Sequence, residues 1–108
     1  YIKRLSHLND ISIPFMNITG LASNYIFPVV LLNSTAEKRD MVRTRLQEKG
    51  IQTSVHYPAV HRFSIYNIYK SELPLTEYVT DNEITLPMYA SLSENEIDYI
   101  TDTLINSL

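Results

Sequence analysis

The 108-residue sequence predicts an α+β fold, a two-layer sandwich in which helices cover a small sheet. Two segments, Ala36–Lys49 and residues 93–108, combine helix start signals with apolar residues at helical spacing. Three short runs rich in β-branched and aromatic residues read as strands, at Tyr25–Leu32, Ile51–Tyr57 and Glu83–Leu86. This order predicts a mostly antiparallel or mixed sheet of three to four strands, with both long helices on one face.

Both long helices have recognisable ends. Residues 33–35, Asn-Ser-Thr, offer N-cap oxygens before the first helix, and Gly50 suits the left-handed position that follows it. Glu37 and Lys49 carry the charges that the helix macrodipole favours at each end. Residues 93–96, Ser-Glu-Asn-Glu, form a capping box. The expected apolar faces are Met41, Val42 and Leu46 in the first helix, and Ile97, Ile100, Leu104, Ile105 and Leu108 in the second.

The run Ile51–Tyr57 alternates in the manner of a strand, with Ser54 and His56 on one face, and Pro58 ends it. Pro28 lacks an amide proton, so we expect the strand containing it to lie at a sheet edge or to have the proline near its start. Shorter helices are expected near Ser64–Tyr69 and from Pro74 to about Asn82.

The N-terminal part is predicted to be a connecting region. Tyr1–Leu8 has a narrow helical stripe, and Ile11–Gly20 reads as an extended connector. We therefore expect residues 1–20 to be the end of an interdomain helix with its connector, and residues 21–108 to form a C-terminal domain. The chain opens without methionine inside a helical pattern, which suggests a piece of a longer protein.

Composition narrows the functional class. The formal net charge of −3 gives no indication of a nucleic-acid or anionic-membrane partner. The apolar runs are too short to span a bilayer, so no membrane association is expected. The absence of cysteine excludes disulfides and thiolate metal sites and fits a cytoplasmic location. Eight tyrosines in so short a chain suit ligand rims and wet interfaces.

The most informative segment is Gly50–His61, which places two histidines and a tyrosine at a predicted strand-to-loop junction. His56, Tyr57 and His61 could contact a substrate or handle a proton. An ordinary surface strand end with hydrogen-bonded histidines explains the same pattern, and periodicity alone favours it. No metal site is expected, because two histidines five residues apart with no cysteine lack a third ligand.

Two other chemistries find little support. No nucleophile-elbow pattern surrounds Ser54, so a hydrolytic triad is not expected. Gly20 and Gly50 are isolated, so the sequence contains no glycine-rich phosphate loop.

Four sequence blocks in this order carry a family resemblance. They are Asn-Tyr-Ile-Phe-Pro-Val-Val at 24–30, Gly-Ile-x-Thr-x-x-His-Tyr-Pro-x-x-His at 50–61, Leu-Pro-Leu-Thr-Glu at 73–77 and Thr-Leu-Pro-Met-Tyr at 85–89. Together they resemble the C-terminal part of the DegT/DnrJ/StrS sugar aminotransferases, which are pyridoxal-phosphate enzymes of fold type I. The resemblance covers roughly residues 20–108, and implies the small domain of such an enzyme.

This resemblance implies a division of labour. The parent would be a cytoplasmic homodimer that transfers an amino group, typically from glutamate, to the keto group of a nucleotide-linked sugar. Its large domain, on the same chain, would hold pyridoxal phosphate. The carried-over substrate contacts are His56, Tyr57 and His61, and Arg62 could meet a nucleotide phosphate. Ala59 departs from the bulkier residue or second proline of many relatives, which leaves the sugar specificity open.

No catalytic or cofactor-binding residue is expected within the chain. Its lysines, at positions 3, 38, 49 and 70, lie outside the family's lysine motif, so the fragment alone is expected to be inactive and cofactor-free. Two alternatives remain: a free-standing, non-catalytic ligand-binding or regulatory α+β module, and a paralogue that has lost its catalytic lysine.

Overall fold

The computed structural model describes residues 1–69 and 71–108. Its sheet is antiparallel, with strand order β1-β2-β3, where β1 is Ile11–Ser12, β2 is Phe27–Leu31 and β3 is Glu83–Leu86. The α-helices are α1 (Ile2–Leu5), α2 (Ala36–Glu48), α3 (Pro74–Asn82) and α4 (Glu94–Ile105), with two 3₁₀ turns, η1 (Val60–Arg62) and η2 (Ser64–Tyr66). The predicted α+β class and small sheet are confirmed.

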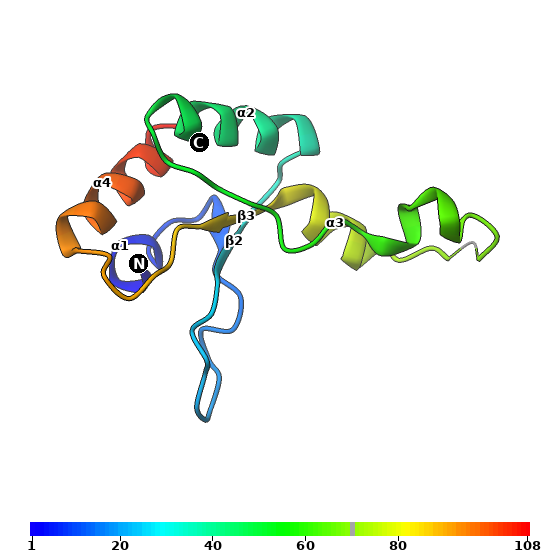
Figure 1. Cartoon of the computed structure of the whole chain (residues 1–108), viewed down its shortest axis with the longest axis horizontal. Coiled ribbons are helices and arrows are strands. Elements are labelled where there is room, and N and C mark those ends of the chain that lie inside the picture. Colours follow the sequence, from blue (N-terminus) through cyan, green and yellow to red (C-terminus); the bar gives the residue numbers. More distant parts are fainter. Residues whose placement is uncertain (70) are drawn as a thin grey trace.

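One face of the sheet and the two long helices enclose the core (Figure 1). Because side chains alternate along a strand, Val29, Leu31, Ile84 and Leu86 all point to this face. They meet Val42 and Leu46 from α2, Ile100 and Leu104 from α4, and Leu5, Ile11 and Ile51 from flanking segments. The buried faces of α2 and α4 are narrower than predicted, since Met41 is 45% exposed and Ile105 is 37% exposed.

The helix ends follow the predicted signals. Thr35 accepts a hydrogen bond from the backbone of Lys38, and Ser93 and Glu96 form the reciprocal capping box of α4. Gly50 has φ +78°, and its N–H donates to Gln47 while that of Ile51 donates to Leu46. These two bonds are a Schellman ending, which turns the chain sharply and places Ile51 in the core.

The continuous strand predicted over Ile51–Tyr57 does not form. Only Ser54 pairs with the sheet, through reciprocal backbone bonds to Thr85 of 3.2 and 2.8 Å. The backbone groups on either side are bound by side chains instead: Arg43 donates to the carbonyl of Thr53, and Glu83 accepts from the N–H of His56. Side-chain partners therefore replace the ladder that a regular strand would need.

Pro28 lies near the start of the central strand, which was one of the two positions expected. Thr85, its partner across β3, directs its backbone N–H and C=O to Ser54, so the Pro28–Thr85 pair is a non-hydrogen-bonded one. The missing amide proton of Pro28 would point toward β1, which reaches only as far as Val30. The proline therefore costs the sheet no hydrogen bond.

The N-terminal region is shorter in helix than predicted and contributes to the core. α1 ends at Leu5, and Ile11–Ser12 of the expected connector pairs with β2. The ring of Tyr1 stacks on Phe27 at 4.7 Å, and its hydroxyl donates to the carbonyl of Pro87 at 2.7 Å. Burial raises the pKa of Tyr1 to about 12. A domain division near residue 20 stays a prediction.

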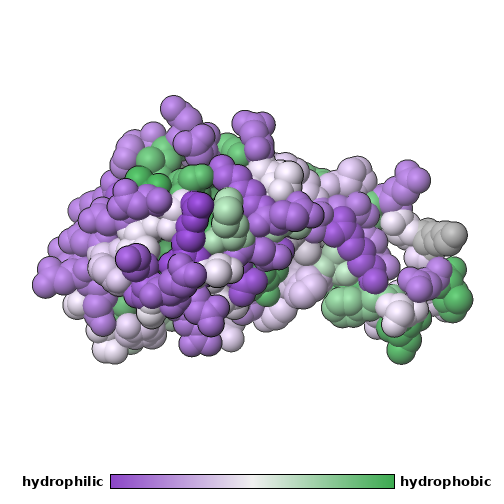
Figure 2. Space-filling view, turned by 90° about the horizontal axis from the view of Figure 1, so that it is seen from above, coloured by the Kyte–Doolittle hydropathy of each residue, from purple (hydrophilic) through white to green (hydrophobic). Residues whose placement is uncertain are grey.

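Two segments extend away from the sheet and its packed helices, which we call the body (Figure 1). One is a loop over residues 13–26, and the other, which we call the arm, is formed by residues 57–69 with η1 and η2. Both expose large apolar side chains, and Figure 2 shows a green cluster at the far end of the arm. These exposed residues are Phe15, Met16, Ile18, Leu21 and Tyr25 in the loop, and Tyr57, Val60, Phe63, Ile65, Tyr66, Ile68 and Tyr69 in the arm.

Ion pairs attach the arm to α3. Arg62 contacts Asp81 at 2.6 Å and Glu77 at 3.2 Å, and Nε2 of His61 lies 2.8 Å from Oε1 of Glu77. The hydrogen bond from His61, together with that from Arg62, lowers the pKa of Glu77. Arg62 likewise lowers the pKa of Asp81. Ala59 is buried at the base of the arm.

No helix within residues 1–69 and 71–108 combines the length and the apolar character that crossing a bilayer requires.

We expect acid to weaken the attachment of the arm. Glu77 and Asp81 have folded pKa values below their ordinary values of 4.5 and 3.8, so their stabilising effect is present above those values. It is lost as the pH falls through the lowered folded values. Arg62→Gln should therefore lower the urea midpoint most near neutrality and progressively less in acid. Lys49→Gln, at an exposed helix end, is the control. A constant Arg62→Gln effect down to about pH 3 would contradict the expectation.

We also expect the isolated chain of residues 1–108 to self-associate, because clustered exposed apolar side chains favour association. Ile65 and Ile68 are 76% and 80% exposed in the arm. Replacing both with serine should lower the apparent mass measured by light scattering at high protein concentration. Gln47→Ser with Asn95→Ser, at exposed polar positions, should leave it unchanged. A monodisperse monomer of the unaltered chain would refute this.

Candidate functional site

His56 lies two residues beyond the backbone bridge that joins Ser54 to β3. Its N–H donates to Oε2 of Glu83 at 3.0 Å. Its Nδ1 lies 2.9 Å from Oγ1 of Thr85 and 3.2 Å from Oγ of Ser54. Thr85 in turn donates its hydroxyl proton to Oε1 of Glu83. The inner edge of the imidazole is therefore tied to the sheet at several points.

The other side of the imidazole is less constrained. Among the residues that the structure describes, none forms a hydrogen bond with Nε2 of His56. The ring of Tyr57 meets that of His56 edge-on, with centroids 4.9 Å apart, and the peptide bond between the two residues is cis. Nε2 can thus bind a ligand group without breaking a contact to the described residues.

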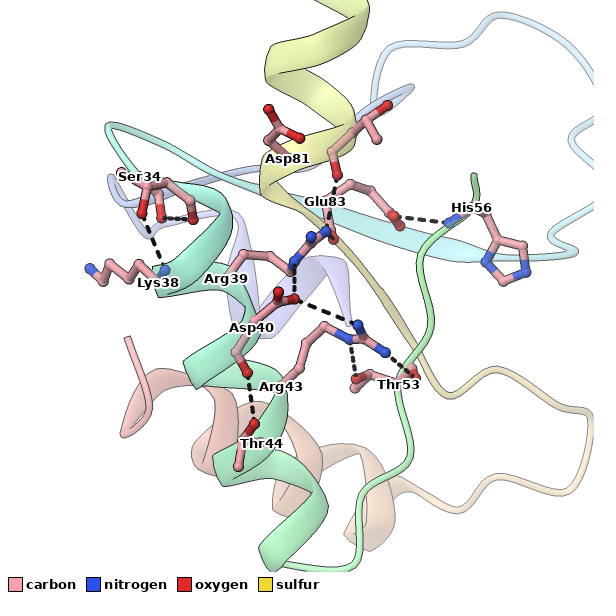
Figure 3. A network of polar contacts seen from close by, with 12 residues as sticks. Ser34, Lys38, Arg39, Asp40, Arg43, Thr44, Thr53, His56, Asp81 and Glu83 are labelled. Carbon is pink, nitrogen blue, oxygen red and sulfur yellow. Dashed lines mark hydrogen bonds and ion pairs between the residues drawn. The ribbon is translucent and has the colours of Figure 1, made fainter. Parts of the chain in front are cut away.

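Arginines of α2 hold the two segments that meet at His56 (Figure 3). Arg39 donates to the carbonyls of Thr80 and Glu83, at 3.0 and 3.2 Å, where α3 passes into β3. Arg43 donates to both the hydroxyl and the carbonyl of Thr53. Asp40 lies 2.7 Å from Arg39 and 3.8 Å from Arg43, between the two guanidinium groups. Through these arginines, α2 fixes the positions of Thr53 and Glu83 relative to each other.

His56 opens onto a groove of about 620 Å³, which we call the His56 groove. Its polar and aromatic lining comes from Tyr25, Ser54, His56, Thr85, Tyr89, Glu96 and Tyr99, with Ile51, Leu86 and Ile100 among its apolar residues. Such a mixture of apolar walls and a few polar groups is typical of a small-molecule site. The tyrosine content predicted ligand rims in general, but nothing in the local sequence assigns Tyr25, Tyr89 and Tyr99 to one groove.

Some of these groups already have partners. Tyr99 donates its hydroxyl to the carbonyl of Lys49 at 2.9 Å. The carboxylate of Glu96 belongs to the capping box, where hydrogen bonds from the side chain and backbone of Ser93 lower its pKa. Nε2 of His56, by contrast, has no hydrogen bond to a described residue.

The remaining predicted contacts lie in other cavities. Tyr57 and His61 line a second groove of about 560 Å³ beside the arm. Arg62 lines a third, of about 520 Å³, together with Arg39 and Asp81. The four predicted substrate contacts are therefore close in sequence, but the structure places them in different cavities. Phosphate binding by Arg62 would have to compete with the carboxylates of Asp81 and Glu77.

The described lysines lie apart from the His56 groove. Lys3, Lys38 and Lys49 are exposed on or beside helices, and none of them lines the His56 groove. Lys70, the fourth lysine of the sequence, lies outside the described residues. Residues 1–69 and 71–108 contain no cluster of three or more histidine, aspartate or glutamate side chains suited to a metal ion.

Known proteins are similar to this chain in sequence and in fold. The dTDP-4-dehydro-2,3,6-trideoxy-D-glucose 4-aminotransferase of Saccharopolyspora spinosa is 31% identical over 102 residues, covering 94% of this chain and 26% of that protein. PseC of Helicobacter pylori, an aminotransferase involved in the biosynthesis of pseudoaminic acid, superposes with a TM-score of 0.90 at 18% identity. That match covers 99% of this chain and 29% of PseC.

A putative sugar aminotransferase of Streptococcus pneumoniae, Spr1654 in its PMP form, gives a TM-score of 0.87 at 24% identity, covering 99% of this chain and 28% of that one. The chain therefore spans between a quarter and a third of the length of these proteins. A family model described as the DegT/DnrJ/EryC1/StrS aminotransferase family matches residues 1–105. On this match and the 31% identity over nearly its whole length, the chain belongs to the DegT/DnrJ/EryC1/StrS aminotransferase family.

Proposed function

We propose that this chain is the C-terminal part of a pyridoxal-phosphate-dependent aminotransferase that acts on a nucleotide-linked keto sugar. The family membership supports the reaction class, and the name of the Saccharopolyspora relative supports the substrate class. The PMP form of the pneumococcal structure supports the cofactor. In this proposal glutamate is the amino donor, and the enzyme is a cytoplasmic homodimer, in keeping with the absence of cysteine from the chain.

The observation that carries the proposal for this chain is the open Nε2 of His56 at the edge of a tyrosine-lined groove. A ligand pocket combines apolar walls with a few fixed polar groups that set orientation. The imidazole is already fixed through Nδ1 and the backbone. Its outer nitrogen can therefore orient a sugar without further ordering of the histidine side chain. His56 therefore recognises substrate and forms one wall of the active site, while the chemistry occurs on the cofactor.

Tyr57, His61 and Arg62 take a secondary role in this proposal. They lie on the arm side of the junction, where His61 and Arg62 pair with carboxylates of α3. Contact with the nucleotide would come from the exposed ring of Tyr57, with His61 and Arg62 reaching it as they exchange carboxylate partners for phosphate.

The rest of the enzyme would supply what this chain does not. Pyridoxal-phosphate chemistry requires a lysine for the Schiff base, a carboxylate for the pyridine nitrogen and a phosphate-binding cup. These groups belong to the large domain of the same chain in this proposal. The exposed apolar side chains of the loop over residues 13–26 and of the arm support packing against that domain or the second subunit.

The first test is a pair of histidine substitutions in the intact enzyme. His56→Ala should raise the KM for the nucleotide sugar by about 5- to 10-fold, the cost of one hydrogen bond to substrate, with a smaller change in kcat. His7→Ala, at an exposed turn after α1, removes the same side chain away from the groove and should leave both constants unchanged. An unaltered kcat/KM in the His56 variant would eliminate the proposed contact.

The second test concerns the cofactor. Purified residues 1–108, mixed with pyridoxal phosphate and dialysed, should retain no borohydride-reducible Schiff-base absorbance. The intact enzyme treated in the same way should retain it. Stable absorbance in the shorter chain that disappears on reduction would show that one of its own lysines holds the cofactor.

A further inference from the structure

We propose that Glu83 and Thr85 are positioning residues that keep the proton of neutral His56 on Nδ1, so that Nε2 accepts a hydrogen bond from a hydroxyl group of the substrate. The inference rests on the proposed function for the identity of the ligand. The tautomer itself follows from contacts within this chain.

The direction of the hydrogen bonds begins at Glu83. Glu83 is 3% exposed, and both of its carboxylate oxygens have partners. Oε2 accepts from the N–H of His56, and Oε1 contacts the hydroxyl of Thr85. The hydroxyl of Thr85 donates to Oε1 of Glu83, so its single proton points to that carboxylate.

That assignment determines the state of the imidazole. Once the proton of Thr85 points to Glu83, its Oγ1 presents lone pairs toward Nδ1 of His56, 2.9 Å away. A deprotonated Nδ1 would set two lone pairs against each other at hydrogen-bonding distance. Nδ1 must therefore carry the proton and donate it to Thr85. In a neutral imidazole the second nitrogen, Nε2, is then an acceptor.

The backbone geometry holds the side chains of Glu83, Thr85 and His56 together. Residues 83 and 85 are two apart on a strand, so their side chains share one face of β3, opposite to the core face of Ile84 and Leu86. The reciprocal backbone bonds between Ser54 and Thr85 bring residue 56 over that face. Oγ of Ser54, at 3.2 Å from Nδ1, is the longer of the two side-chain contacts and can share the same proton.

The consequence is a choice of ligand chemistry. Neutral His56 would present an acceptor, and not a donor, to the His56 groove, and it would therefore select a group that donates. The hydroxyl groups of a sugar are such donors. If Nε2 carried the proton instead, the same position would favour carbonyl or phosphate oxygens.

The test separates the hydroxyl of Thr85 from its shape. Thr85→Val keeps the branched side chain of a buried strand residue and removes the hydroxyl, whereas Thr85→Ser keeps the hydroxyl. Long-range ¹H–¹⁵N NMR of the intact enzyme, with ¹⁵N-labelled histidine and no substrate, reports which imidazole nitrogen bears the proton. The resonances of His56 are assigned by their loss in His56→Ala.

We expect the Nδ1–H form of His56 in the unaltered enzyme and in Thr85→Ser. We expect loss of its dominance in Thr85→Val, and its retention in Ser54→Ala. An Nε2–H form in the unaltered enzyme, or an unchanged Nδ1–H form in Thr85→Val, would overturn the proposal. Circular dichroism of each variant shows whether the fold is intact, and Thr85→Ser provides the rescue.

Kinetics then separate this inference from the proposed function. Thr85→Val should raise the KM for the nucleotide sugar about 5-fold, with a smaller effect on kcat. Thr85→Ser should have the KM of the unaltered enzyme. If NMR shows the expected tautomers and the KM does not change in Thr85→Val, the positioning by Thr85 stands and the acceptor role toward substrate fails. If the tautomer result fails, the positioning fails whatever the kinetics of His56→Ala show.

Discussion

The backbone pair between Ser54 and Thr85 is the contact on which the site depends. In the described part of the chain, it is the one backbone pairing between the segment that joins α2 to α3 and the sheet. Without it, the buried carboxylate of Glu83 would lose the N–H of His56 and keep only the hydroxyl of Thr85 as a donor, and an incompletely hydrogen-bonded buried carboxylate is destabilising. The same pair places His56 over Thr85, so the stability of the sheet edge and the geometry of the groove have one origin.

Helix α2 supports this contact from the other direction. Its Schellman ending at Gly50 directs the chain back toward the sheet, with Ile51 buried as the first anchor. Arg39 and Arg43 then bind backbone carbonyls on both converging segments. Charge-assisted bonds to otherwise unpaired carbonyls are stronger than neutral ones. One helix thereby contributes to the core through its apolar stripe and to the site through its arginines.

The body and its two extensions differ in how their apolar side chains are used. Buried apolar side chains from both helices and the sheet hold the body together. The arm is joined to α3 by ion pairs of partly exposed groups, each of which contributes modestly in water. Its apolar residues face solvent, an arrangement that fits a part of a larger assembly. The relatives that the chain matches are three to four times its length.

Local signals in the sequence determined the helices and the fold class: the N-caps at Thr35 and Ser93 and the glycine at position 50 act within a few residues of themselves. The sequence also identified His56 as a residue of interest. Only the tertiary structure decided that the alternating run after Gly50 is a single bridge, because Arg43 and Glu83, distant in sequence, supply its hydrogen bonds. It also separated His56 from the other predicted contacts, since cavities are formed by elements whose packing no local pattern encodes.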